Sequence, residues 1–387
     1  MSDIRKLVQE HKDLIIETRR DLHRIPELAY QEKKTAEYVT SYLRREKIEV
    51  QTGIAQTGVV GLLKGGADGK TLLLRADMDA LPIKEETGLP FASAHEGIMH
   101  ACGHDAHMAM ALGAATILNG IKDRLSGNIK FVFQPAEEGE AGARAMIEAG
   151  VMENPKVDWS IGIHVWPAIA EGKIGVKDGL LLAAMDRFDL TILGKGGHAA
   201  TPHLCVDALD VSAMVVSALQ RVVSRQMNPF SPTVLSVCSL HAGTAFNAIP
   251  GEAKMSGTTR TFDRDVWDSW QERMERIVCG VCESMGAKYK LKYRRGYPPT
   301  INDHAMAELV RECAAASVGE ENVVETSQAM TSDDISYFLD KSPGCFFQLG
   351  VGRGDEMNLH TCTFDFNENI LLKGVETYCR AALSLLV

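Results

Sequence analysis

The segment Ile98-Met99-His100-Ala101-Cys102-Gly103-His104-Asp105-Ala106-His107 places three imidazoles and one thiol within eight residues, just before an apolar run at 108–118. Thiolate and neutral imidazole are the donors that zinc and similar metals prefer. On an extended backbone, Cys102 and His104 would project to the same side, and Gly103 would let the main chain approach an ion. The segment therefore predicts a metal site in front of a helix. On these residues alone, a thiol and imidazoles that merely precede a helix remain the alternative.

The bulk composition is that of an ordinary globular protein. With 387 residues we expect two or three domains, and 45% hydrophobic and 24% charged residues are typical values. The net charge of −10 argues against nucleic acid or an anionic membrane as partner. No signal peptide is recognisable, and no apolar run approaches the roughly 18 residues of a membrane span. Nine scattered cysteines argue against a disulfide framework, so we expect a soluble, cytoplasmic protein.

Short apolar runs alternate with helical patterns through the first half of the chain. Strands are predicted at 59–63, 71–75, 129–133 and 159–163, and helices at 3–24, 32–47, 105–118 and 141–149. This alternation predicts an α/β domain with a mostly parallel sheet, in which ligands bind beyond the carboxyl ends of the strands. Four candidate side chains fall at that edge: Asp77, Glu137, Glu138 and His164.

From about residue 185 the order becomes β-α-β-β-α-β, which is the order of a ferredoxin-like unit. Its strands are predicted at 187–193, 233–240, 252–262 and 287–293, and its helices at 206–223 and 267–285. The α/β pattern then resumes with a helix at 305–317 and a strand at 345–349. We therefore predict a catalytic domain of residues 1–184 and 298–387, and an inserted ferredoxin-like α+β domain of residues 185–297. Cys279 and Cys282 form a C-x-x-C pair inside a helical pattern, and we interpret them as packing positions.

The candidate metal ligands come from four separate segments of the chain: Cys102, His104, Glu138, His164 and His360. Five donors would crowd one ion, whereas two divalent ions (manganese, zinc, cobalt or nickel) could use them all if Cys102 bridges. Glu137 and Glu138 would point opposite ways on an extended backbone, so that one acid binds metal while the other faces a water molecule. The alternative for this pair is a solvated charged loop.

Taken together, these segments resemble the M20 metallopeptidase family, specifically its amidohydrolase branch of aminoacylases, hippurate hydrolases and auxin-conjugate hydrolases. The matching stretches are DLHRIPEL at 21–28, LRADMDALP at 74–82, HACGHD at 100–105, FQPAEE at 133–138, GGHAATPH at 196–203, FNAIP at 246–250 and GTTRTF at 257–262. They span nearly the whole chain in the expected order, which makes the resemblance far more specific than any single motif.

The resemblance implies a two-metal catalytic domain with the five ligands named above, and an inserted lid that also forms a homodimer or a higher homo-oligomer. It implies Glu137 as the general base and places Asp77 among the catalytic residues. His198, contributed by the lid of a dimer partner, would donate to the developing oxyanion. Asn247 and Arg260 would bind the α-carboxylate of the substrate, since Arg can grip a carboxylate through two parallel hydrogen bonds.

The implied reaction is hydrolysis of the amide bond of N-acyl-L-amino acids. Metal ions would activate water and polarise the carbonyl, and Glu137 would carry the proton to the leaving amine. One alternative is a dipeptidase or carboxypeptidase of the same family, which would need acidic residues placed to hold a substrate ammonium. A second alternative is a catalytically silent metal- or ligand-binding protein, against which the intact base argues.

Two departures from the family pattern affect these expectations. Arg75-Ala76-Asp77 stands where the wider family has His-x-Asp with the His as ligand, and we expect His104 to replace it. Asp333-Asp334-Ile335 stands where the branch typically has Glu-Asp-Phe. The shorter acid and the lost aromatic ring mean that substrate preference cannot be carried over from the branch.

Overall fold

The computed structural model describes residues 2–354 and 358–387. The chain divides into two compact units. The first consists of Met1–Leu181, Thr300–Ser327 and Asp333–Val387, and the second of Leu182–Pro299 and Gln328–Ser332. Within the described residues, no helix is both long and apolar enough to cross a membrane.

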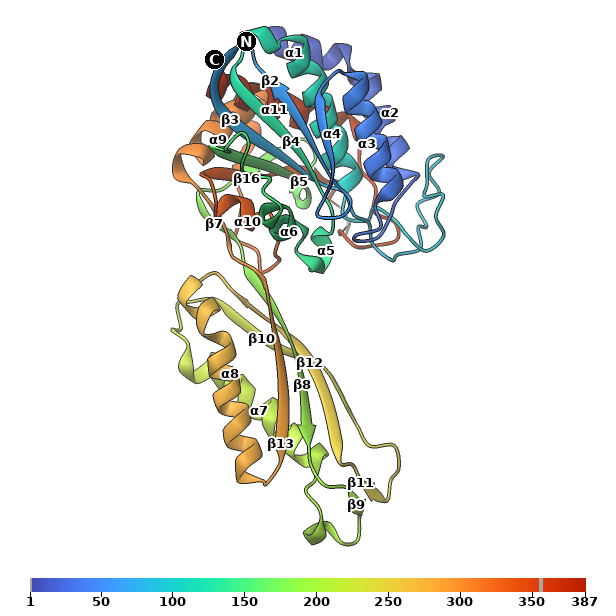
Figure 1. The fold of residues 1–387 in the computed structure, drawn as a ribbon, viewed down its shortest axis with the longest axis vertical. Coiled ribbons are helices and arrows are strands. Elements are labelled where there is room, and N and C mark those ends of the chain that lie inside the picture. The colour runs from blue at the N-terminus through green and yellow to red at the C-terminus, as the bar shows by residue number, and fades with distance from the viewer. Residues whose placement is uncertain (1, 355–357) are drawn as a thin grey trace. The chain divides into compact units, whose positions relative to one another are not determined.

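The first unit is built on one large sheet, which has eight strands within the described residues (Figure 1). Its strands, in spatial order, are β1 (Glu49–Ile54), β2 (Gly58–Lys64), β4 (Ser126–Gln134), β3 (Ala67–Asp77), β5 (Trp159–Ala170), β16 (Gly344–Gly352), β6 (Ile174–Val176) and β15 (Val323–Glu325). Pairing is parallel from β4 through β3 and β5 to β16, and again between β6 and β15. The predicted α/β class with a mostly parallel sheet is confirmed.

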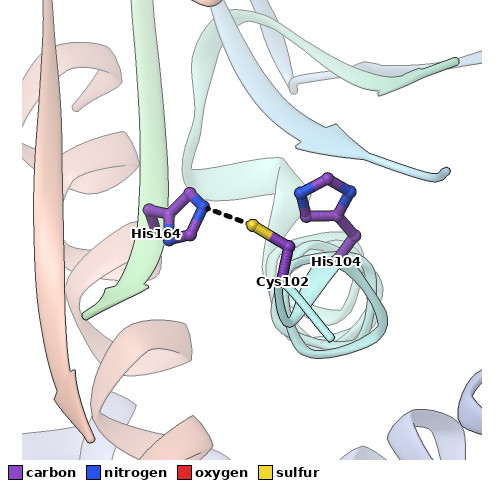
Figure 2. A group of neighbouring side chains, drawn as sticks. All are labelled: Cys102, His104 and His164. Carbon is purple, nitrogen blue, oxygen red and sulfur yellow. Dashed lines mark hydrogen bonds between the residues drawn. The ribbon is translucent and has the colours of Figure 1, made fainter. Parts of the chain in front are cut away.

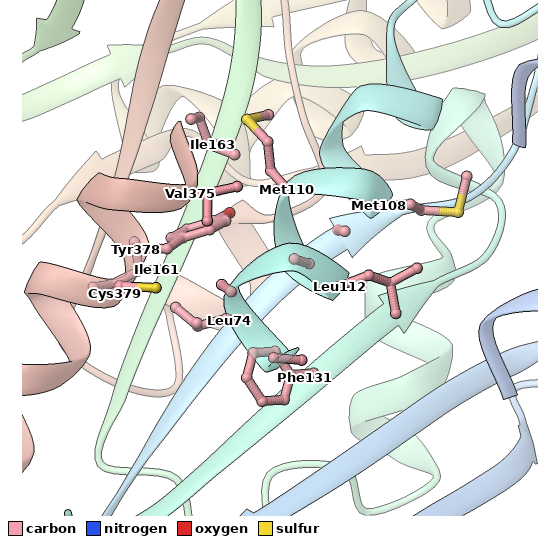
Figure 3. Close-up of a cluster of buried hydrophobic side chains, with 14 of the residues drawn as sticks. Leu74, Met108, Met110, Leu112, Phe131, Ile161, Ile163, Val375, Tyr378 and Cys379 are labelled. Atoms are coloured by element: carbon pink, nitrogen blue, oxygen red, sulfur yellow. The ribbon is translucent and has the colours of Figure 1, made fainter. Parts of the chain in front are cut away.

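Helix α4 (His104–Gly120) is the central helix of this unit. Its sequence is apolar on all sides, and such a helix is stable only when it is enclosed. Most of its side chains are buried. Figure 3 shows Met108, Met110 and Leu112 of α4 among Leu74 of β3, Phe131 of β4 and side chains of α11 (Leu371–Leu386). The packing fixes the axis of α4, and with it the position of His104 at its first turn.

The remaining helices cover the two faces of the sheet. They are α1 (Ser2–Glu10), α2 (Lys12–His23), α3 (Lys33–Arg45), α5 (Glu137–Glu140), α6 (Gly142–Glu148), α9 (His304–Val318) and α10 (Ser336–Leu339). Two neighbouring residues of β5 illustrate the two faces of the sheet. A Cβ on Gly162 would contact Ile335, which directly precedes α10, whereas the next residue, Ile163, lies against Gly374 of α11.

Several elements differ from the sequence prediction, among them the short strands β6 and β15, which were not predicted. The helix predicted at 3–24 is two helices, because the chain turns at His11, whose Nδ1 bonds the carbonyl of Leu7 at 2.8 Å. Strand β1 was not predicted, since most of its side chains are exposed and give no apolar run. His164 does not follow the end of a strand, because β5 continues beyond it to Ala170.

The second unit is a four-stranded antiparallel sheet covered by two helices. The strand order is β10 (Thr233–Ala242), β12 (Glu252–Thr261), β8 (Ala184–Leu193) and β13 (Lys288–Tyr297), with α7 (Ala208–Gln226) and α8 (Arg264–Ser284). This is the predicted ferredoxin-like topology. Cys282 of the C-x-x-C pair is buried in its core, beside Trp270 and Met274. A small ribbon of β9 (Gly197–His198) and β11 (Ala248–Ile249) completes the unit.

The compact units and the predicted domains differ at residues 182–184 and 298–299, and in one further segment. Residues 328–332 were assigned to the catalytic domain, but the structure groups Gln328–Ser332 with the second unit. The physical reason is backbone hydrogen bonding, since the N–H of Ala183 donates to the carbonyls of Ala329 at 3.1 Å and Thr331 at 3.0 Å. That the second unit acts as a lid or a dimerisation domain stays a prediction.

Candidate metal centre and active site

The first unit brings all five predicted metal ligands together in two groups that share Cys102. One group is Cys102, His104 and His164, and the other is Cys102, Glu138 and His360. The Sγ atom of Cys102 lies 3.5 Å from Nε2 of His164 and 3.4 Å from Nε2 of His360 (Figure 2 shows the first group). Nε2 of His360 is also 3.2 Å from a carboxylate oxygen of Glu138. A thiolate between two such groups has the geometry that a bridging ligand needs.

The local backbone differs from the one assumed from the sequence. Cys102-Gly103-His104 is not extended, because Gly103 has φ 85° and starts α4, with His104 as the first helical residue. This left-handed conformation favours glycine. A Cβ at Gly103 would also lie 2.3 Å from Val165, so the turn can come close to β5 only without a side chain. The two ligands therefore meet through a helix start and not through strand alternation.

Two of the imidazoles are oriented for metal by backbone carbonyls. Nδ1 of His104 donates to the carbonyl of Asp79 at 2.8 Å, and Nδ1 of His164 donates to that of Val165 at 2.6 Å. Each bond leaves Nε2 as the nitrogen that faces the other ligands. Nε2 of His104 is buried and makes no hydrogen bond to the described residues.

The other two imidazoles of the predicted segment have different roles. His107 accepts the N–H of Val165 at Nε2 (3.0 Å) and donates from Nδ1 to Asp77 at 2.6 Å, so neither nitrogen is left for a metal. His100 is fully buried, and burial lowers its pKa to about 3. It belongs to neither ligand group.

The acidic pair Glu137 and Glu138 lies on a tight turn, not on extended backbone as assumed. Ala136 has φ 56° before the pair, and Glu138 itself leaves the helical region. Asp79 accepts the N–H groups of Glu137 and Glu138, one on each carboxylate oxygen and both at 2.9 Å. Glu32 accepts the N–H of Ala136 at 2.9 Å. Two buried carboxylates therefore hold this strained turn.

A buried guanidinium stands beside the centre. Arg75 donates to Asp77 at 2.7 Å, to Gln134 at 2.8 Å and to Asp334 at 2.9 Å, and lies 3.1 Å from Asp333. Burial alone would raise the pKa of Asp77, but Arg75, His104 and His107 together outweigh it and hold that pKa well below the usual range. Asp77 is therefore ionised, with its two oxygens directed to Arg75 and His107.

The electrostatics of the centre match a cation site. Burial and the neighbouring carboxylates, Glu138 first among them, raise the pKa of the Cys102 thiol well above its ordinary value. Burial likewise raises the pKa of Glu137, with Asp333 adding to the effect. Burial would lower the pKa of His104, but Asp77 and Asp79 raise it to about 10. These shifts mark an excess of negative charge that divalent cations would offset, and the sulfur–nitrogen–oxygen donor set fits zinc, manganese, cobalt or nickel.

The three predicted residues of the second unit are not buried. His198 is exposed on β9, and Ala199, which follows it, donates to the carbonyl of Asn247 at 3.1 Å. Nδ1 of His198 accepts the N–H of Ala200 at 3.0 Å, so its other nitrogen carries the proton. Arg260 is half-buried on β12 and bonds Thr258. The described residues include no carboxylate within 4.0 Å of its guanidinium, so Arg260 forms no ion pair with a nearby acid such as Asp263.

Comparison with known proteins identifies the family. The sequence profile of peptidase family M20/M25/M40 matches residues 73–384. The chain belongs to peptidase family M20. The predicted family and the predicted hydrolase class are confirmed, and the M20 fold accounts for the two units described above.

Two sequences and one solved structure illustrate which known proteins this M20 hydrolase is similar to. It is 46% identical over 301 residues to an N-acyl-L-amino acid amidohydrolase from Geobacillus stearothermophilus, covering 78% of this chain and 81% of that one. It is 39% identical to thermostable carboxypeptidase 1 of Saccharolobus solfataricus, covering 97% and 96%. The solved structure of the Bacillus subtilis YXEP protein, described as a dinuclear metal binding peptidase, superposes with a TM-score of 0.84 at 36% identity, covering 98% and 99%.

Several residues of the M20 site were not found from the sequence. Asp79 stands two positions after Asp77, the last residue of β3, and that spacing was a usable signal. His107 was noted as an imidazole but given no role. Nothing in the sequence near Glu32 pointed to a contact with Ala136, because the two are joined by tertiary structure alone.

Proposed function

We propose that this M20 hydrolase cleaves the amide bond of N-acyl-L-amino acids and holds two divalent metal ions. The observation that carries the proposal is the pair of ligand groups sharing Cys102, with Glu137 beside them in a third group with His104 and Glu138. Cys102 would bridge, with His104 and His164 on one side and Glu138 and His360 on the other. The bound ions would supply Lewis acidity that activates water and polarises the amide carbonyl.

The residues of the chain would perform the proton transfers. Glu137, in the same turn as the ligand Glu138, would accept a proton from the attacking water and return it to the leaving amine. Asp77, held ionised between Arg75 and His107, would keep the centre negative enough to retain its cations.

Arg260 would recognise the α-carboxylate, which is constant across N-acyl amino acids. Its guanidinium lacks a carboxylate partner within the described residues, so a bidentate grip on a ligand is open to it. Asn247 would add a hydrogen bond, and His198 would donate from the nitrogen not used by Ala200.

The internal geometry of the second unit supports a partner copy. Arg260 pairs with Met185 at one end of β12, whereas β9 and β11 adjoin the other end, where Glu252 pairs with Leu193. Arg260 is eight residues after Glu252, a separation of about 26 Å along the strand. One small substrate cannot touch both Arg260 and His198 of the same unit, so we propose a homodimer in which His198 and Asn247 serve the partner's substrate.

A peptidase acting on a free amino group is the second candidate, and relatives named carboxypeptidase give it weight. It would require acidic groups free to hold the ammonium. Asp333 and Asp334 do lie beside Glu137. Both are engaged, because Arg75 contacts each of them and Asp334 also accepts from Gln134 at 2.7 Å. Because the Arg75 guanidinium already pairs with these two acids, they are not free to hold a substrate ammonium, which favours the N-acyl substrate.

The test is a matrix of metals and substrates. Chelated protein is reloaded with manganese, zinc, cobalt or nickel and assayed on N-acetyl and N-benzoyl amino acids and on dipeptides. We expect no hydrolysis without metal, recovery with it, and a preference for N-acyl substrates. A preference for dipeptides would replace the proposed substrate class, and full activity in verified metal-free protein would reject the metal mechanism.

Cys102→Ser provides a structural check on the same proposal. A hydroxyl bridges such metals poorly, so both ions should be bound more weakly by elemental analysis. Two tightly held ions in this variant would show that Cys102 is not the shared ligand.

A further inference from the structure

We propose that Asp79 is a positioning residue that fixes the metal ligand Glu138 and the general base Glu137 relative to each other. The inference rests on the proposed function in one respect, the role given to Glu137. Asp79 lies in the loop after β3 and is 1% exposed. Its carboxylate contacts backbone groups of the acidic turn, so it is argued to act through other residues and not on substrate.

The side chain of Asp79 fixes two consecutive residues of the turn. One oxygen accepts the N–H of Glu137 and the other accepts the N–H of Glu138, each at 2.9 Å. Both bonds are charge-assisted, which makes them shorter and stronger than neutral ones. A rotation of this peptide segment would move the base and the ligand together, so the two bonds set where both carboxylates point.

The main chain of Asp79 orients a second ligand. Its carbonyl accepts Nδ1–H of His104 at 2.8 Å, which directs Nε2 of that ring toward the other donors. Outer contacts of this kind set the tautomer and the direction of a ligating imidazole. Asp79 therefore joins the loop after β3, the first turn of α4 and the turn of α5 at one point.

The substitution Asp79→Asn exploits the symmetry of these bonds. The amide keeps the size of the side chain but replaces one acceptor oxygen by an NH₂ group. Whichever way the amide lies, that donor faces a backbone N–H, so one bond is lost and a buried N–H is left without a partner. The turn should then be free to shift while the fold around it persists.

Asp158→Asn is the matched control. Asp158 also accepts a backbone N–H, that of Thr71 at 2.8 Å, and it also sits in the first unit. Thr71 is six residues before Asp77 on β3, about 20 Å along the strand. One oxygen of Asp158 accepts this bond, so the asparagine oxygen can keep it, and the control removes the charge of an anchor without breaking a bond or touching the metal centre.

Three readouts separate positioning from general stability: affinity for Co²⁺ by chelator competition, the visible spectrum of the cobalt-loaded protein, and kcat and KM on an N-acetyl amino acid. In Asp79→Asn we expect cobalt affinity or kcat to fall by about 10- to 100-fold, with an altered spectrum and KM nearly unchanged. Asp158→Asn should leave all three readouts at their wild-type values. The two metal readouts need no substrate, so they stand even if the proposed substrate class fails.

Wild-type cobalt affinity, spectrum and kcat in Asp79→Asn would overturn the proposal, as would equal effects in both variants. If Asp79→Asn does not fold, Asp79→Ser replaces it. The serine hydroxyl can accept one of the two N–H groups, and its own hydrogen can rotate away, whereas the NH₂ group of asparagine must face the other N–H. An intermediate loss of cobalt affinity in Asp79→Ser supports the role, and wild-type values there reject it.

Discussion

In the first unit, Cys102, His104 and His164 are buried and meet from separate segments, whereas in the second unit His198 is exposed and Arg260 half-buried. The first set is held by hydrogen bonds to backbone and by buried charge. In the second set Arg260 donates to Thr258 and to the carbonyl of Thr259, and His198 accepts the N–H of Ala200, so both are held by local contacts. The contrast teaches that the metal centre is a property of one folded unit, while the residues that we propose for substrate recognition are not fixed in the same way by the unit that carries them.

The largest expected effect lies in the buried set. Glu137→Gln removes the proton acceptor but keeps the size of the side chain, so turnover should fall about a hundredfold or more while metal content stays. Glu138→Gln should instead lose metal. Steady-state kinetics with elemental analysis checks both variants, and exchanged outcomes would mean that the roles of the two acids are reversed.

The next effect is a pH dependence that only a buried network can give. His23 contacts Asp105 at 2.8 Å and Glu85 at 3.2 Å. Burial would lower the pKa of His23, but Asp105 and then Glu85 raise it to about 9. Because the folded pKa lies above the usual 6.5, this stabilisation is complete below pH 6.5 and is lost as pH rises through 9.

The measurement is denaturant unfolding of His23→Gln and wild type between pH 6 and 9.5. The pH-dependent part of their difference should shrink by about 3 kcal/mol over that range. His241→Gln, at an exposed position of β10 in the second unit, is the control and should show no such trend. A pH-independent difference for His23→Gln would contradict the network.

Recognition by the second unit should give a smaller effect that depends on the substrate. Arg260→Ala should cost about 1.5 to 3 kcal/mol in substrate binding, the range for hydrogen bonds to charged groups. The loss should be much smaller for a substrate whose carboxylate is masked as an amide. Equal losses on both substrates would show that Arg260 supports the fold and not the ligand.

The smallest effect belongs to an exposed ion pair of the second unit. Arg295 and Asp268 lie 2.6 Å apart with both side chains largely solvated. Asp268→Asn should change the free energy of unfolding by no more than about 0.5 kcal/mol, because solvent screens such pairs. If Asp268→Asn lowered the free energy of unfolding as much as His23→Gln, the contrast between buried contacts in the first unit and exposed contacts in the second would be wrong.

The elements that could be predicted from the sequence are those whose burial leaves a recognisable pattern of apolar residues. Helix α4 could be predicted because its residues are apolar on all sides, and the ligands because Cys102 and His104 are close in sequence. The backbone around them could not be predicted. Ala136 adopts φ 56° although alanine rarely does, and its N–H is held there by Glu32, which is far away in the sequence. Asp79 was missed for the same reason, since its bonds reach backbone groups that only folding brings near.

One consequence follows from the way α4 is enclosed. Its first residue is a ligand and its later turns are sealed in the apolar core, so the packing that holds the sheet also holds His104 when no cation is bound. Small zinc domains differ, because they fold only around their metal. In this chain the position of the ligand His104 is set by the packing of the fold and not by the metal. We therefore expect the first unit to stay folded when its cations are removed, so that one cation could be exchanged for another.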